Sequence, residues 1–221
     1  GWTSINSFEV DWDNPADASG IQGAYYRLDS VPTADEDGTY TTSKPITGIT
    51  VSGDGPHPIY IWLKDNADNV NYMNRGSTTL YLDTTGPTRP GMPTTTSPTS
   101  NTTPTWTWDA STDADSGLRA TNTYIIYWGT TPESEDNSAY TNTNSYTHTV
   151  ELDNGTWYAK VKAYDAVDNE SEFSEVGSVV IDTTIPRVFI DSGPDDPTNS
   201  TSATFEYHSD PPGCEFSYSL D

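Results

Sequence analysis

The sequence is poor in basic residues, cysteine and long apolar runs, and each shortage excludes a class of protein. Nine Lys and Arg stand against 33 Asp and Glu, so the formal net charge is −24. Binding to nucleic acid needs a basic face, and we therefore expect no nucleic-acid partner. Cys214 is the only cysteine, which excludes an intrachain disulfide and a cysteine metal cluster. No stretch approaches the ~20 apolar residues of a membrane span, so we expect no such span in this chain.

Helical periodicity is also lacking, and short alternating segments take its place. Hydrophobic residues make up only 32% of the chain, yet aromatic residues make up 12%. The regular spacing of aromatic residues argues against disorder, because disordered segments are poor in them. Pairs of similar segments alternate with period two, which predicts β-strands. These pairs are 7–12 and 103–108, 24–29 and 123–128, 58–65 and 155–165, and 77–83 and 177–182.

The same landmarks occur twice, in the same order, at intervals of 96 to 100 residues. They are Asp-Thr-Thr-x-Pro from Asp83 and Asp182, Asp-x-x-Asp-Asn from Asp65 and Asp165, and an acidic loop after Trp12 and Trp108. Such spacing indicates duplicated units. Strands and turn signals at this density predict an all-β fold of tandem antiparallel β-sandwiches.

The repeat divides the chain into three parts. We expect a sandwich lacking its first strand at 1–85, a complete sandwich at 86–185, and the first strands of a third, incomplete repeat at 186–221. Pro87 and Pro186 suit semi-rigid junctions, because proline restricts its neighbour and cannot donate to a ladder. We interpret the chain as an internal piece of a longer polypeptide. In the alternative, neighbouring molecules complete the sheets by strand donation.

The segment GTWYAKVKAYDAVDNES (155–171), followed by VVIDTTIP (179–186), resembles the end of a fibronectin type III or bacterial immunoglobulin-like module. The resemblance covers essentially the whole chain and implies an extracellular or cell-surface location in a bacterium or archaeon. It also implies a non-catalytic spacer or adhesive role, with neighbouring domains or subunits as partners. The side chains expected to carry that role are the junction prolines and the core residues Trp12, Trp108 and Trp157.

Motifs of catalysis are missing from the sequence. His57, His148 and His208 fall in three different units, and no nucleophile elbow, His-Glu-x-x-His helix or phosphate-binding glycine loop occurs. A glycosidase pair of carboxylates needs a shaped cleft, which a small sandwich seldom provides. We therefore expect that the chain is not an enzyme.

Clustered acids suggest a calcium site as the one cofactor. In a sandwich of this type, the loop after the Trp108 strand, the loop after the long penultimate strand and the preceding junction lie at one pole. The expected ligands are Asp83, Asp109, Asp113, Asp115, Asp165 and Asp168. Calcium takes six to eight oxygen ligands. In the alternative, Asp-x-x-Asp-Asn is a tight turn whose side chains bond the local backbone.

Surface glycans are a second candidate ligand. If Ile59 faces the core, period two turns Tyr60 and Trp62 outward, and Tyr25 on the neighbouring strand joins them. Exposed aromatic rings of this kind stack on sugars, which would suit an accessory region of a secreted hydrolase. In the alternative, the rings only cover the flank or lie under a loop. A further alternative function is a surface filament or surface-layer subunit assembled by strand exchange.

Four Asn-x-Ser/Thr sequons would accept glycans in a secreted protein. They are Asn101, Asn154, Asn169 and Asn199. In a sequence so rich in Asn and Thr, several such matches are expected by chance.

Overall fold

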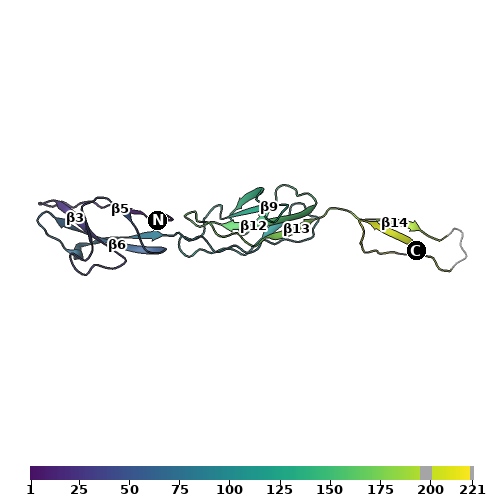
Figure 1. Cartoon of the computed structure of the whole chain (residues 1–221), viewed down its shortest axis with the longest axis horizontal. Coiled ribbons are helices and arrows are strands. Elements are labelled where there is room, and N and C mark those ends of the chain that lie inside the picture. Colours follow the sequence, from purple (N-terminus) through teal and green to yellow (C-terminus); the bar gives the residue numbers. More distant parts are fainter. Residues whose placement is uncertain (195–200, 220–221) are drawn as a thin grey trace.

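The computed structural model describes residues 1–194 and 201–219, and it is almost entirely β. Apart from the short 3-10 helix η1 (Tyr72–Asn74), the regular elements of the described residues are strands. Figure 1 shows three groups of strands in a row along the long axis of the molecule. Within the described residues, no strand of one group pairs with a strand of another. The predicted all-β fold with several antiparallel sheets is therefore confirmed.

The first unit, as we call it, contains β1 to β7. A five-stranded sheet has the order β1-β7-β6-β3-β4, and β2 pairs with β5 in a second sheet. The strands are β1 (Trp2–Thr3), β2 (Phe8–Val10), β3 (Ile21–Leu28), β4 (Thr39–Thr41), β5 (Ile46–Ile49), β6 (Gly55–Asp65) and β7 (Gly76–Leu82). All of these pairings are antiparallel except that of β1 with β7.

The second unit contains β8 to β13 and the segment that leads into β8. Its sheets have the orders β10-β9-β12-β13 and β11-β8. The strands are β8 (Thr105–Thr107), β9 (Tyr124–Gly129), β10 (Asn137–Thr141), β11 (Ser145–Thr147), β12 (Gly155–Ala163) and β13 (Gly177–Ile181). Before β8, Thr94 pairs with Thr107 and Thr99 pairs with Ile181, so the leading segment contacts both sheets in turn.

The third group is an isolated pair, β14 (Arg187–Ser192) with β15 (Glu206–Asp210). Most of its side chains are exposed, including Val188, Ile190 and Tyr207. The boundaries predicted at residues 85 and 185 fall between the three groups of strands.

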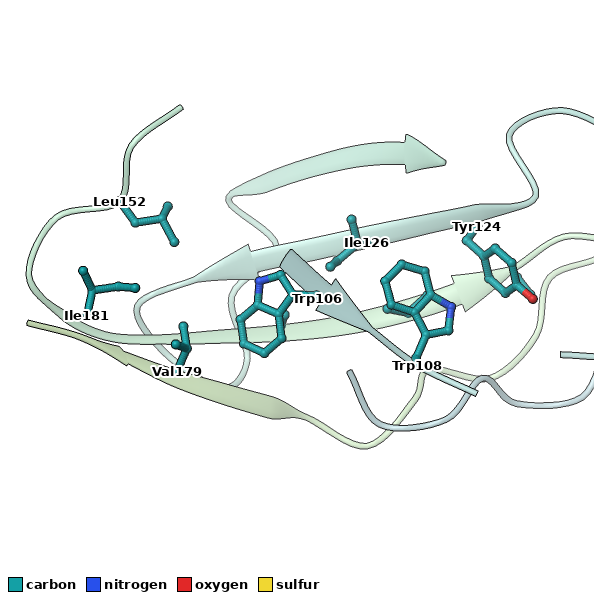
Figure 2. Packing of buried hydrophobic residues seen from close by; sticks show 10 residues of the cluster. Trp106, Trp108, Tyr124, Ile126, Leu152, Val179 and Ile181 are labelled. Carbon is teal, nitrogen blue, oxygen red and sulfur yellow. The ribbon is translucent and has the colours of Figure 1, made fainter. Parts of the chain in front are cut away.

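The core of the second unit lies where the alternation predicts it. Ala159, Val161 and Ala163 are buried on the inner face of β12, and Trp157 packs partly buried against them. The other members are Trp106, Trp108, Tyr124, Ile126, Leu152, Val179 and Ile181. Figure 2 shows the two tryptophans in the centre, with Tyr124 at one end and Leu152 and Ile181 at the other.

The two junctions differ in how closely they are packed. Pro87 is buried at the first, where the Thr88 amide donates to the carbonyl of Thr112 at 2.8 Å. A Cβ on Gly86 would lie 2.0 Å from the Glu170 carbonyl oxygen, so the chain there touches the second unit directly. Pro186, by contrast, is exposed. The first junction is thus built into the second unit.

Candidate metal centre

Five carboxylates meet where the first unit joins the second. Asp54 precedes β6, Asp83 follows β7, Asp113 and Asp115 lie in the loop after β8, and Asp165 follows β12. One oxygen from each of Asp54, Asp83 and Asp115 lies within 4.8 Å of the others, and the same holds for Asp83, Asp113 and Asp165. Asp83 belongs to both triplets and joins them. We call these five residues the junction cluster.

Local turns position two members of the cluster. Asp113 Oδ1 accepts hydrogen bonds from the amides of Asp115 and Gly117, at 3.2 and 2.8 Å. Asp165 Oδ1 accepts from the amides of Val167 and Asn169, at 2.9 and 2.8 Å. The tight-turn interpretation of Asp-x-x-Asp-Asn is therefore correct, and Asp65 makes the same bonds in the first unit.

Contacts across the junction hold Asp83 between the two units. Its Oδ2 accepts from the Ser116 amide at 3.0 Å, and its carbonyl oxygen accepts from Asn169 Nδ2 at 2.9 Å. On the side of the first unit, its amide donates to the Thr3 carbonyl at 2.9 Å. The last residue of one repeat is in this way hydrogen-bonded to two loops of the next.

The cluster concentrates negative charge where water has little access. Asp83 and Asp165 are both 0% exposed. Burial raises the pKa of Asp115, and the nearby carboxylates of Asp83, Asp54 and Asp113 raise it further. Burial also raises the pKa of Asp165, against the hydrogen bonds from Asn169 that lower it. Among the described residues, no Lys, Arg or His forms an ion pair with any member of the cluster.

Two of the six predicted ligands lie outside the cluster, so the prediction is wrong for them. Asp168 occupies a left-handed turn position (φ 73°) and pairs with Arg119 at 2.5 Å. Asp109 is exposed, and its backbone carbonyl accepts from the Gly91 amide.

Asp54 is the member that sequence reasoning missed. It accepts hydrogen bonds from the amide and hydroxyl of Thr84 and from the hydroxyl of Thr85. Asn154, one repeat later, accepts from Thr183 in the same way. The repeat spacing could therefore have indicated that residue 54 lies at the junction. The signal is weak, however, because the second unit has Asn at the position where the first has Asp.

The aromatic residues predicted to bind sugar do not form an exposed platform. Trp62 is 1% exposed and Tyr25 is 9% exposed. They stack on each other with ring centroids 5.7 Å apart, while Tyr60 is half-buried. The expectation that Trp62 and Tyr25 face solvent is therefore wrong.

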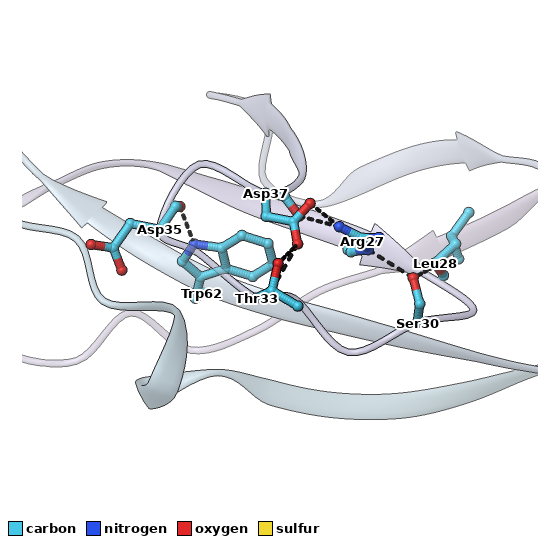
Figure 3. Close-up of polar contacts among 7 residues, drawn as sticks. All are labelled: Arg27, Leu28, Ser30, Thr33, Asp35, Asp37 and Trp62. Atoms are coloured by element: carbon cyan, nitrogen blue, oxygen red, sulfur yellow. Dashed lines mark hydrogen bonds and ion pairs between the residues drawn. The ribbon is translucent and has the colours of Figure 1, made fainter.

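The loop between β3 and β4 covers this face of the sheet. Figure 3 shows Trp62 Nε1 donating to the carbonyl of Asp35, at 2.6 Å. Asp37 holds the loop in shape, because its carboxylate pairs with Arg27 and accepts from the amide and hydroxyl of Thr33. Gly38 has no room for a Cβ, which would lie 2.6 Å from the Trp62 ring. The alternation of side chains along β6 correctly placed Trp62 on the face away from the core. It could not show that the loop between β3 and β4 covers that face.

The sequons differ in how accessible they are. Asn101 and Asn154 are exposed, and glycosylation at these two residues remains a prediction. Asn169 Nδ2, the atom to which a glycan would attach, instead donates to Asp83 and Asp165, at 2.9 and 2.6 Å. That engagement argues against a glycan at Asn169. Asn199 lies outside the described residues.

No family model and no curated protein matches this chain. Solved structures do match it. One contains the FN1–FN3 domains of chicken CNTN1, with a TM-score of 0.41 and 11% identity, over 82% of this chain and 61% of that one. The likeness is to fibronectin type III domains. Another contains fibronectin(III)-like modules of Clostridium thermocellum CbhA, with a TM-score of 0.35 and 13% identity, over 81% of this chain and 87% of that one.

These likenesses concern the fold alone. Fibronectin type III modules are also what the segments at 155–171 and 179–186 resemble in sequence. No helix among the described residues has the length and apolar character needed to cross a membrane.

Proposed function

We propose that this chain is a non-catalytic spacer array of an extracellular or cell-surface protein, and that calcium fixes its first junction. The observation that carries the proposal is the junction cluster, in which carboxylates from two successive units approach one another. In the part of the chain that the structure describes, none of them forms an ion pair with a basic side chain. A spacer transmits position only if its units keep their relative orientation. An ion held by ligands from both units would supply that constraint.

The chemistry of the cluster suits Ca²⁺ better than other common ions. All five side chains are carboxylates, and hard oxygen ligands of this kind bind calcium in sets of six to eight. No cysteine or histidine belongs to either triplet, which argues against zinc. Buried carboxylates without a counter-ion repel one another, and this repulsion destabilises the folded state. A bound divalent cation would remove it.

A neighbouring hydroxyl group supports a bound ligand. Ser116 Oγ is buried and has no hydrogen-bond partner among the described residues. Its backbone amide donates to Asp83 Oδ2, so the residue is adjacent to the cluster. Buried polar groups almost always find a partner, and an ion or its bound water would provide one here.

Calcium is expected to raise the melting temperature of the full chain. A ligand present at 100 times its dissociation constant stabilises the state that binds it by about 2.7 kcal/mol. Scanning calorimetry in EDTA, in calcium and in magnesium would measure the shift. An unchanged melting profile in calcium would refute the site.

Matched variants locate the effect. Asp115→Asn removes one carboxylate from the cluster and is expected to abolish most of the calcium-dependent shift. Asp109→Asn alters an exposed acid in the same loop and should keep the shift. An equal loss in both variants would mean that calcium acts by general screening of the charge of −24.

Small-angle scattering tests the spacer role separately. The full chain with calcium is expected to give one extended shape, and removal of calcium should broaden the distribution of interatomic distances, because the first junction then bends. A compact particle in both conditions would contradict the role as a spacer.

A further inference from the structure

The second unit has a polar hollow beside its smaller sheet, which we call the threonine hollow. Its volume is about 600 Å³, and it is lined by six threonines, Asn101 and Pro104. None of these lining residues is charged or aromatic, although the chain as a whole carries a charge of −24. The hollow therefore suits a neutral group that is rich in hydroxyls, rather than an ion or an apolar ligand.

The path of the leading segment creates the hollow. Thr94 and Thr107 exchange both backbone hydrogen bonds, at 2.8 and 2.9 Å, so the segment first lies against β8. Five residues later, Thr99 pairs with Ile181 of β13, in the other sheet. The segment thus leaves β8 after Thr94, and the hollow lies beside the part of β8 that it does not cover.

The backbone of Thr105 faces this hollow. The Pro104 carbonyl and the Trp108 amide form hydrogen bonds with the chain at either end of β11, each at 3.2 Å. Thr107 uses the opposite edge of β8, where it pairs with Thr94. Residues two apart on a strand share an edge, so the Thr105 amide and carbonyl point to the same side as those of Thr107. Among the described residues, neither group has a hydrogen-bond partner.

The threonine hydroxyls add further donors and acceptors. Thr96 is exposed, and its hydroxyl forms no hydrogen bond with another described residue. The Thr99 hydroxyl accepts from the Asn101 amide at 3.1 Å, so its own proton is still available. The Thr105 hydroxyl lies 2.8 Å from that of Thr147. Because each hydroxyl has one proton and two lone pairs, every one of them can still bond to a ligand.

Asn101 presents its amide nitrogen at the wall of the hollow. Its Oδ1 accepts from the amide and the hydroxyl of Thr103, at 3.0 and 3.2 Å, which is a tight turn closed by an asparagine side chain. Since Oδ1 is directed at Thr103, Nδ2 points away from the turn. Nδ2 forms no hydrogen bond with another described residue. Asn101, Thr102 and Thr103 are also a glycosylation sequon.

The other two described sequons lack this arrangement. Asn169 Nδ2 donates to Asp83 and Asp165. Asn154 Oδ1 accepts from Thr183, while Thr156 of its own sequon lies within β12. Neither asparagine lines the threonine hollow. Of the sequons that the structure describes, Asn101 is therefore the one that joins an available Nδ2 to a polar hollow.

We propose that Asn101 carries an N-linked glycan whose first sugars occupy the threonine hollow. In the covalent step, Asn101 Nδ2 attacks the anomeric carbon of an oligosaccharide linked to a lipid diphosphate. The bond from that carbon to the phosphate oxygen breaks, the lipid diphosphate leaves, and Nδ2 gives one proton to a base of the transferase. Sugar hydroxyls then donate to the Thr105 carbonyl and accept from its amide. This inference rests on the extracellular location in the proposed function and does not depend on calcium.

Mass spectrometry of peptides tests the attachment site. The full chain is secreted from eukaryotic cells, and we expect a glycan on Asn101. Asn101→Gln and Thr103→Ala should both lose it, because each removes a required part of the sequon. Asn154→Gln is the matched control and should keep it. An unmodified Asn101, or sugar found on a threonine of the hollow in its place, would overturn the proposal.

Hydrogen exchange, followed by NMR, tests where the glycan lies. The glycosylated chain is compared with the same chain made in a bacterium that lacks the transferase. We expect the Thr105 amide to exchange about fivefold more slowly in the glycosylated chain, as one ordinary hydrogen bond implies. The Trp106 amide faces β11 in both forms and should not change. Equal exchange of the Thr105 amide in the two forms would overturn the placement of the sugars.

A pair of threonine variants separates the hollow from the rest of the surface. Thr96→Val removes a hydroxyl of the hollow and is expected to reduce the protection of the Thr105 amide. Thr121→Val alters an exposed threonine of another loop and should leave that protection intact. Equal effects of the two substitutions would contradict the proposal. A negative result in these experiments leaves the spacer function unaffected, because calorimetry and scattering test that function.

Discussion

Replacing Trp106 with alanine is expected to lower the free energy of unfolding of the second unit by roughly 3–5 kcal/mol, as large-to-small core substitutions do. Trp106 is 0% exposed and lies at the centre of the core cluster. Its removal leaves a cavity bounded by β13 and by the ring of His148. Domains of this size are stable by only about 5–15 kcal/mol, so much of the stability of this unit would be lost.

A hydrogen bond adds to the cost of the substitution. Trp106 Nε1 donates to His148 Nε2 at 3.0 Å in a buried environment. Alanine leaves that acceptor without a donor, and an unsatisfied buried polar group costs about 1–3 kcal/mol. Trp106→Phe keeps most of the ring volume but lacks the Nε1 donor. Its free energy of unfolding should therefore lie between that of the wild type and that of Trp106→Ala.

Calorimetry of the full chain measures the effect, because separate units are expected to melt in separate transitions. Trp12→Ala in the first unit is the matched control, since Trp12 is only half-buried. It should leave the transition of the second unit in place. If Trp106→Ala shifts the transition of the second unit no more than Trp157→Ala, which alters a partly buried ring, the central role of Trp106 is refuted.

Acid is expected to destabilise the second unit through His148. Burial lowers the pKa of this imidazole from 6.5 to about 4. The ring lies against Trp128 and Tyr146, with centroids 4.9 and 5.2 Å away. Nε2 accepts the Trp106 hydrogen bond, so Nδ1 carries the proton of the neutral ring. A second proton on Nε2 would face the indole N–H and break that bond.

The sign of the pH dependence follows from the lowered pKa. The unfolded chain binds a proton on His148 below about pH 6.5, while the folded chain stays neutral down to about pH 4. Stability is therefore full above pH 6.5, falls as the pH drops to about 4, and then levels off. One pKa unit corresponds to about 1.4 kcal/mol, so the total loss is about 3 kcal/mol.

Denaturant titrations between pH 7.5 and 5 would measure the slope, since most carboxylates stay ionised in that range. His148→Gln keeps an acceptor for Trp106 and does not titrate, so its stability should be nearly constant there. His208→Gln, an exposed residue of the third group, should keep the wild-type slope. Identical slopes in the wild type and His148→Gln would show that His148 is not the titrating group.

Much of the fold could be predicted because the relevant signals are local. Period two along β12 assigns Ala159 and Val161 to the core, since successive side chains on a strand point to opposite faces. The repeat spacing located both acidic loops and both Asp-x-x-Asp-Asn turns, and the turn bonds at Asp65 and Asp165 follow from Asp and Asn chemistry.

The junction cluster was predicted in part, for a similar reason. Asp83, Asp113, Asp115 and Asp165 follow from strand ends that meet at one pole. Asp168 was assigned wrongly, because its side chain turns to Arg119, a contact that depends on the left-handed turn and on loop packing. Asp54 was missed because it reaches the cluster through hydrogen bonds to Thr84 and Thr85 rather than through a motif.

By itself, the amino-acid sequence determined that this chain is acidic, all-β and repetitive, with an alternating core and turns at fixed places. Those properties depend on side-chain chemistry within a few residues, and a repeat carries them from one unit to the next. Only the tertiary structure decided that Trp62 is covered, that Asp54 joins four other carboxylates, and that a polar hollow lies beside Thr105. Each of these depends on segments far apart in the chain coming together, and period and spacing do not encode those distances.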